Sequence, residues 1–100
     1  MINEAEIQKL IYTALETVNE EQAPAQRFVV DQNTILFGVN ASIDSLSLVS
    51  LIVDIESALN GDFNLEISLT DDRAMTREIS PFTDVKALQT FIMELVGELQ

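Results

Sequence analysis

Apolar residues recur at helical spacing near both ends of the 100-residue chain, and this pattern constrains the fold more than any other feature. Residues three and four positions apart share one face of an α-helix, so such a stripe predicts a helix with one buried side. The first stripe predicts a helix from about Glu4 to Asn19, and the last predicts a helix that begins after Thr83. The first consists of Ile7, Leu10, Ile11, Ala14, Leu15 and Val18, and the last of Val85, Leu88, Phe91, Ile92, Leu95 and Val96.

Residues near the helix ends agree with these bounds. Asn3 can act as the N-cap of the first helix, with Glu6 at the third helical position, as in a capping box. Pro24 lies in the segment that ends this helix. Thr83 is the expected N-cap of the last helix. The pattern therefore predicts an all-α chain, and its length fits a single domain spanning residues 1–100.

A third helix is predicted in the middle of the chain, where Asp44, Ser45 and Leu46 precede a long apolar run. The carboxylate of Asp44 can accept the unpaired backbone N–H groups of the first helical turn, so Asp44 is the expected N-cap and Ser45 the first helical residue. The hydroxyl of Ser45 would then face solvent at the positive end of the helix dipole. A phosphate on that hydroxyl would be favoured there.

This middle helix is expected to run from about Ser45 to Leu59 and to end near Asn60 and Gly61. It is apolar on more than one stripe, which fits either a helix buried on several sides or a semi-exposed apolar patch. The positions expected to face the core are Leu46, Val49, Ile52 and Ile55 or Leu59, while Leu48, Leu51 and Val53 are expected to lie partly outside it.

Two connecting segments are less regular. Residues 27–43 contain apolar residues that could form a strand, but no second strand is evident. We therefore expect a long ordered loop that its apolar side chains pin to the helices, and a loop of this length is uncommon unless it has a function. Residues 61–67 form a second loop, and a short helix is expected to run from Ser68 or Thr70 to about Met75.

The composition excludes several classes of function. The absence of cysteine and histidine excludes disulfides, thiolate chemistry, Ser-His-Asp catalysis and the usual zinc sites. Residues 62–67 carry alternating oxygen ligands, but Ile67 stands where an EF-hand loop needs glycine, so no metal site is predicted. No apolar run approaches the ~20 residues that span a bilayer, so we expect a cytoplasmic chain without membrane insertion. The net charge of -12 opposes binding to nucleic acid and favours basic protein partners.

The Asp44-Ser45-Leu46 motif, with the apolar helix behind it, resembles the attachment site of acyl carrier proteins and peptidyl carrier domains. The likeness extends over essentially the whole chain, most closely over residues 36–59 and 82–96. It implies that Ser45 carries 4'-phosphopantetheine, which a separate phosphopantetheinyl transferase takes from coenzyme A, with Asp44 and Leu46 completing the cofactor-binding motif. It also implies a bundle of three longer helices and one short helix, in a monomer that is not itself an enzyme.

The resemblance further implies a surface for partner enzymes that transfer, activate or condense acyl groups through basic docking surfaces. Leu48, Asp54 and Glu56 are the expected partner-binding residues, and the middle helix could also form one wall of a cavity for an acyl chain. Typical fatty-acid carriers have acids two and five positions after the serine, where this chain has Ser47 and Ser50. This departure points to a specialised lipid, polyketide or related biosynthetic pathway.

A second interpretation belongs to a different class of function. The chain could be a non-carrier acidic helical adaptor that binds basic protein partners, with Ser45 only the first residue of a helix. Intact mass after incubation with coenzyme A and a transferase discriminates the two, because only a carrier gains the phosphopantetheine group.

Overall fold

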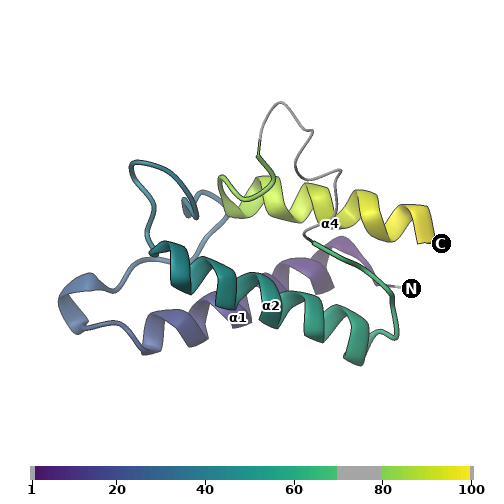
Figure 1. Cartoon of the computed structure of the whole chain (residues 1–100), viewed down its shortest axis with the longest axis horizontal. Coiled ribbons are helices and arrows are strands. Elements are labelled where there is room, and N and C mark those ends of the chain that lie inside the picture. Colours follow the sequence, from purple (N-terminus) through teal and green to yellow (C-terminus); the bar gives the residue numbers. More distant parts are fainter. Residues whose placement is uncertain (1, 70–79, 100) are drawn as a thin grey trace.

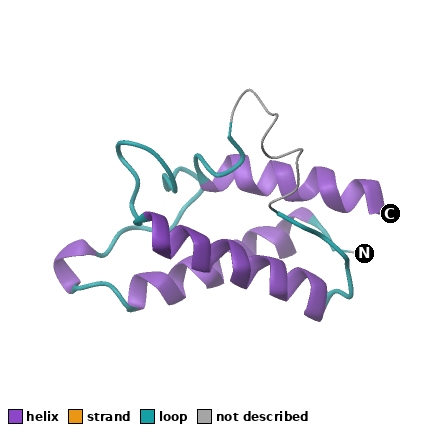
Figure 2. Ribbon diagram, viewed as in Figure 1, coloured by secondary structure: helices purple, strands orange, loops and turns teal. Residues whose placement is uncertain are grey.

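The computed structural model describes residues 2–69 and 80–99, and these residues are all-helical with no strand (Figures 1 and 2). The all-α class predicted from the sequence is confirmed for them. No helix among them has the length and apolar content needed to cross a membrane. The elements in chain order are α1 (Glu4–Glu20), a short 3₁₀ turn η1 (Pro24–Gln26), α2 (Ser45–Asp62) and α4 (Val85–Leu99).

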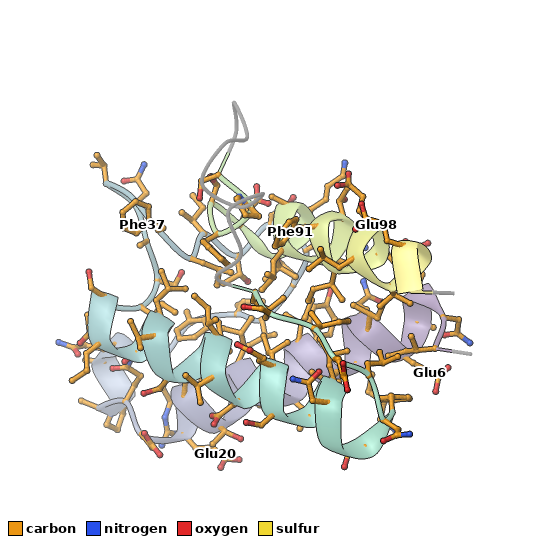
Figure 3. The ribbon with its side chains drawn as sticks, turned by 45° about the vertical axis from the view of Figure 1, so that its right-hand side comes forward. Glu6, Glu20, Phe37, Phe91 and Glu98 are labelled. Carbon is orange, nitrogen blue, oxygen red and sulfur yellow. The ribbon has the colours of Figure 1, made fainter. Side chains whose placement is uncertain are left out.

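The helix α1 is the central element of the packing. The helices α2 and α4 run in the same direction and antiparallel to α1 (Figure 1). Every close backbone approach between two of these described helices involves α1. The segment after α2 runs back between α2 and α4 and buries Ile67 and Leu69 (Figures 1 and 3). The short helix expected from Ser68 or Thr70 to Met75 falls mostly in residues 70–79, outside the described residues.

The starts of α1 and α4 show which side chains cap them. Asn3 caps α1 through a complete capping box, in which its side chain accepts the Glu6 N–H and its own N–H donates to Glu6 Oε1. This prediction is confirmed. At α4 the expected cap, Thr83, is wrong: the carboxylate of Asp84 accepts the Ala87 N–H at 2.7 Å, while Thr83 Oγ1 donates to the Ser80 carbonyl. Thr83 and Asp84 are adjacent, and Asp84 is the residue that immediately precedes the helix, which is the N-cap position.

The buried face of α2 is only partly the one expected. Ile52, Ile55 and Leu59 are buried and Val53 is exposed, as predicted. Leu46 and Val49 were expected in the core but are exposed, and Leu48 and Leu51 were expected partly outside it but are buried. The expected stripe advanced three residues at a time, and each such step rotates about 60° short of a full turn. Positions nine apart therefore end on opposite sides of the helix. The true core stripe follows the mixed spacing of three and four and consists of Leu48, Leu51, Ile52, Ile55 and Leu59.

Asparagine side chains near the ends of α1 and α2 tie down the segments that follow. The amide of Asn19 donates to the Phe28 carbonyl at 2.9 Å and accepts the Phe28 N–H at 3.0 Å. Asn60 makes the same pair of bonds with the backbone of Ile67, at 3.1 and 2.8 Å. Asn60 is thus inside α2 and does not end it; the helix continues to Asp62.

The connection between α1 and α2 follows the start of α4. The Leu36 N–H donates to the Thr83 carbonyl at 2.8 Å, and the Val85 N–H donates to the Thr34 carbonyl at 3.1 Å. Leu36 is buried in the core, as is Ile43 just before α2. The expected loop is confirmed, with one isolated β-bridge between residues 35 and 84 and no strand in its described residues. These bonds fix the segment that leads into α2.

Candidate functional site

Ser45 is the first residue of α2, and its side chain is exposed. Asp44 is the N-cap, as predicted, with extended backbone at φ -84° and ψ 173°. Its Oδ1 accepts the Ser47 N–H at 2.7 Å. The backbone N–H of Ser47, and then its hydroxyl, lower the pKa of Asp44 below the ordinary value of 3.8, because both stabilise the charged form. The cap is therefore a carboxylate at neutral pH.

The first turn of α2 leaves two backbone donors beside this hydroxyl. The N–H groups of Ser45 and Leu46 donate to no acceptor among the described residues, as is usual at the first positions of a helix. No acidic residue lies within the first turn after the cap. A phosphoester on Ser45 would therefore meet unpaired donors and the positive end of the helix dipole.

Three apolar side chains, Leu46, Val49 and Val53, form an exposed stripe on α2 that begins next to Ser45. They are 77%, 57% and 53% exposed, and their spacing of three and four places them on one face. We call these three residues the outer stripe. Leu48, expected as a partner-binding residue, is buried in the core and cannot form such a surface.

The two acidic residues expected to bind partners differ in their exposure to solvent. Asp54 is exposed beside the outer stripe, and Glu56 is half-buried. Ser50, which stands where typical fatty-acid carriers have an acid, is exposed, and Ser47 is half-buried beneath the cap. Apart from the Asp44 carboxylate, the exposed side chains at the start of α2 are therefore apolar or hydroxyl-bearing.

A small hollow adjoins Ser45 on the side of the preceding loop. Its volume is about 350 Å³, and its lining combines the buried Leu36 and Ile43 with the half-exposed Phe37. Figure 3 shows Phe37 on the loop above the N-terminal end of α2. The complete lining is Leu36, Phe37, Gly38, Ala41, Ile43, Asp44 and Ser45.

The loop that forms this hollow is closed by its own backbone. The Ser42 N–H donates to the Ile35 carbonyl at 2.8 Å, and the Ala41 N–H donates to the Gly38 carbonyl at 3.2 Å. Gly38 has a φ of +112°, a conformation that side-chain-bearing residues rarely adopt. Of the residues that line the hollow, Asp44 and Ser45 were among those predicted from the sequence, whereas Phe37, Gly38 and Ala41 were not. The signal available was the glycine within the long loop, a few residues before the cap.

A larger groove lies elsewhere, between α1 and α2, with a volume of about 530 Å³. Leu10 and Phe63 contribute apolar surface, and Glu6, Asp54 and Asp62 contribute carboxylates. Its lining on α2 begins at Asp54, nine residues after Ser45, which is about 14 Å along the helix axis. Among the residues that the structure describes, no group of three or more acidic side chains is arranged to hold a metal ion.

Comparison with known proteins adds no relative to this description. No family model matches the chain, and neither a curated protein nor a solved structure matches it.

Proposed function

We propose that this protein is an acyl carrier that holds acyl intermediates as thioesters on a 4'-phosphopantetheine arm attached to Ser45. One observation supports the proposal most strongly: Ser45 is exposed at the first position of α2, directly after a capping aspartate. The resemblance of Asp44-Ser45-Leu46 to the carrier motif indicates which group this exposed hydroxyl would carry, namely 4'-phosphopantetheine. The family's bundle, completed by a short helix, its monomeric state and a cytoplasmic location are part of the same proposal.

The attachment reaction is a phosphoryl-type transfer on the serine hydroxyl. The Ser45 oxygen forms a new bond to the phosphorus that bears the pantetheine group, and the pyrophosphate bond of coenzyme A breaks. Adenosine 3',5'-bisphosphate leaves, and the serine proton passes to a base of the transferase or to solvent. The unpaired N–H groups of Ser45 and Leu46 would stabilise the resulting phosphodiester.

The arm would supply the chemistry that the chain lacks. Its terminal thiol forms thioesters, and this chain has no cysteine of its own. The protein therefore acts as a carrier and not as an enzyme, and the reactions on the acyl group belong to separate partners.

The surface around Ser45 favours partners that recognise apolar contacts. The outer stripe presents Leu46, Val49 and Val53 beside the attachment point, and Ser47 and Ser50 replace the acids of typical fatty-acid carriers. Basic partners would still be attracted by the net charge of -12. This combination supports a dedicated lipid, polyketide or related pathway over the main fatty-acid synthase.

The test is intact mass after incubation with coenzyme A and a broad-specificity phosphopantetheinyl transferase. The wild-type chain should gain the mass of one phosphopantetheine group, and Ser45→Ala should gain none while keeping its helicity. Ser42→Ala is the matched control, because Ser42 lies three residues away but precedes the helix and is half-buried. Ser42→Ala should be modified normally. An unmodified wild-type chain would favour the acidic adaptor instead.

A further inference from the structure

We propose that the hollow beside Ser45 binds the pantoyl end of the phosphopantetheine arm. This placement rests on the proposed function, since the arm must first be attached to Ser45. It specifies where the arm lies: against residues 36–43, on the loop side of α2, and not along the outer stripe.

The position and chemistry of the hollow fit this part of the arm. Ser45 itself forms part of the lining, so a group attached to its hydroxyl starts at the mouth of the hollow. One methylene group after the phosphate, the arm carries a carbon with two methyl groups, its most apolar part. Leu36 and Ile43 provide a buried apolar floor for these methyl groups, and Phe37 provides an aromatic wall.

The backbone of the loop complements the first amide of the arm, which follows the dimethyl carbon after one hydroxyl-bearing carbon. The N–H groups of Gly38 and Ile43 donate to no acceptor among the residues that the structure describes. Both residues line the hollow. These N–H groups can donate to the pantoyl carbonyl, and the one charged side chain in the lining is the Asp44 carboxylate.

The exposure of Phe37 gives the proposal a physical driving force. Phe37 is 55% exposed, and covering its ring removes apolar surface from water. Val39 lies two residues away on the same loop, is fully exposed and does not line the hollow. Substituting Phe37 therefore tests a contact with the arm, and substituting Val39 controls for the general effect of removing an apolar side chain from this loop.

The size of the hollow limits what it can hold. About 350 Å³ is near the lower end of the range for small-molecule sites, so it fits the proximal half of the arm and leaves the thiol outside. The larger groove between α1 and α2 is a poorer site for this half. It starts about 14 Å along α2 from Ser45, which is too far for the first groups of an arm attached there, and its charged lining residues are Glu6, Lys9, Asp54 and Asp62.

The experiment uses coenzyme A with ¹³C in the two pantoyl methyl groups, loaded onto wild type, Phe37→Ala and Val39→Ala. Mass spectrometry first checks that each protein carries the arm. In wild type we expect nuclear Overhauser contacts from the labelled methyl groups to the Phe37 ring, and methyl shifts displaced from those of free coenzyme A. In Phe37→Ala the methyl shifts should return toward the free values, and in Val39→Ala they should stay as in wild type.

Each other outcome has a distinct meaning. If wild type gains no mass, the proposed function fails and this placement fails with it. If wild type is loaded but its methyl groups keep the shifts of free coenzyme A, the carrier function stands and the placement is overturned. Contacts to Leu10 or Phe63 in place of Phe37 would likewise overturn it, in favour of the groove between α1 and α2. Equal changes in Phe37→Ala and Val39→Ala would reject a specific role for Phe37.

Discussion

At the scale of single residues, replacing Gly38 and replacing Gly61 by alanine should have opposite effects on stability. A Cβ added to either would meet no atom within 4 Å, so space does not distinguish them. Gly38 has a φ of +112°, whereas Gly61 lies inside α2. Gly38→Ala should destabilise the protein by about 1–3 kcal/mol through backbone strain. Gly61→Ala should stabilise it by about 0.5–1 kcal/mol, because alanine is the better helix former. Urea unfolding of the two variants measures both effects; shifts of the same sign would contradict this account.

At the same scale, the Asp44 carboxylate makes the stability of the folded protein depend on pH. Its pKa is lowered in the folded protein by the hydrogen bonds from Ser47, so its stabilising contribution is full above the ordinary value of 3.8 and is lost as pH falls through the folded pKa. Asp44→Asn keeps a capping side chain but removes this titration. Wild type should therefore exceed Asp44→Asn in Tm at pH 6, and the difference should shrink below pH 4. Thermal unfolding across this range checks it, and a constant difference would show that the charge contributes nothing.

At the scale of elements, α2 has two apolar sides with different consequences. Leu48 is buried, so Leu48→Ala should cost about 2–5 kcal/mol through lost burial and a cavity. Val49 follows it directly but is 57% exposed, so Val49→Ala should change stability by no more than about 0.5 kcal/mol. Denaturant unfolding of the pair checks the assignment of the two sides. Similar losses for both would mean that the outer stripe is part of the core.

The elements also show how far the sequence could predict the structure. The stripes of α1 and α4 were found correctly because each has one apolar and one polar face. In α2 both sides are apolar, so periodicity alone could not decide which side is buried. Asp44 and Ser45 were identified because capping is local in sequence. The hollow was missed because it depends on how the loop is positioned, and bonds to residues near Thr83, far along the chain, fix that position.

At the scale of the whole molecule, 17 acidic and 5 basic residues produce mutual repulsion. Raising salt from 0.01 to 0.1 M shortens the Debye length from about 30 to about 10 Å. The latter is below the smallest extent of the molecule, 20 Å, so repulsion across it would be screened. The Tm should therefore rise with salt over this range. Sucrose, which carries no charge, serves as a control for general solvent effects, and a Tm indifferent to salt would show that the charges are already balanced.

The bonds between the loop and the start of α4 link the attachment site to the other end of the chain. Leu36, in the lining of the hollow, donates to Thr83, and Val85 donates to Thr34. One local opening of this contact would release both amides, so in deuterium exchange Leu36 and Val85 should lose protection together. Unequal protection of the two would show that they open independently. If they open together, a ligand or substitution that loosens the first turn of α4 would also loosen the support of Ser45 without touching it.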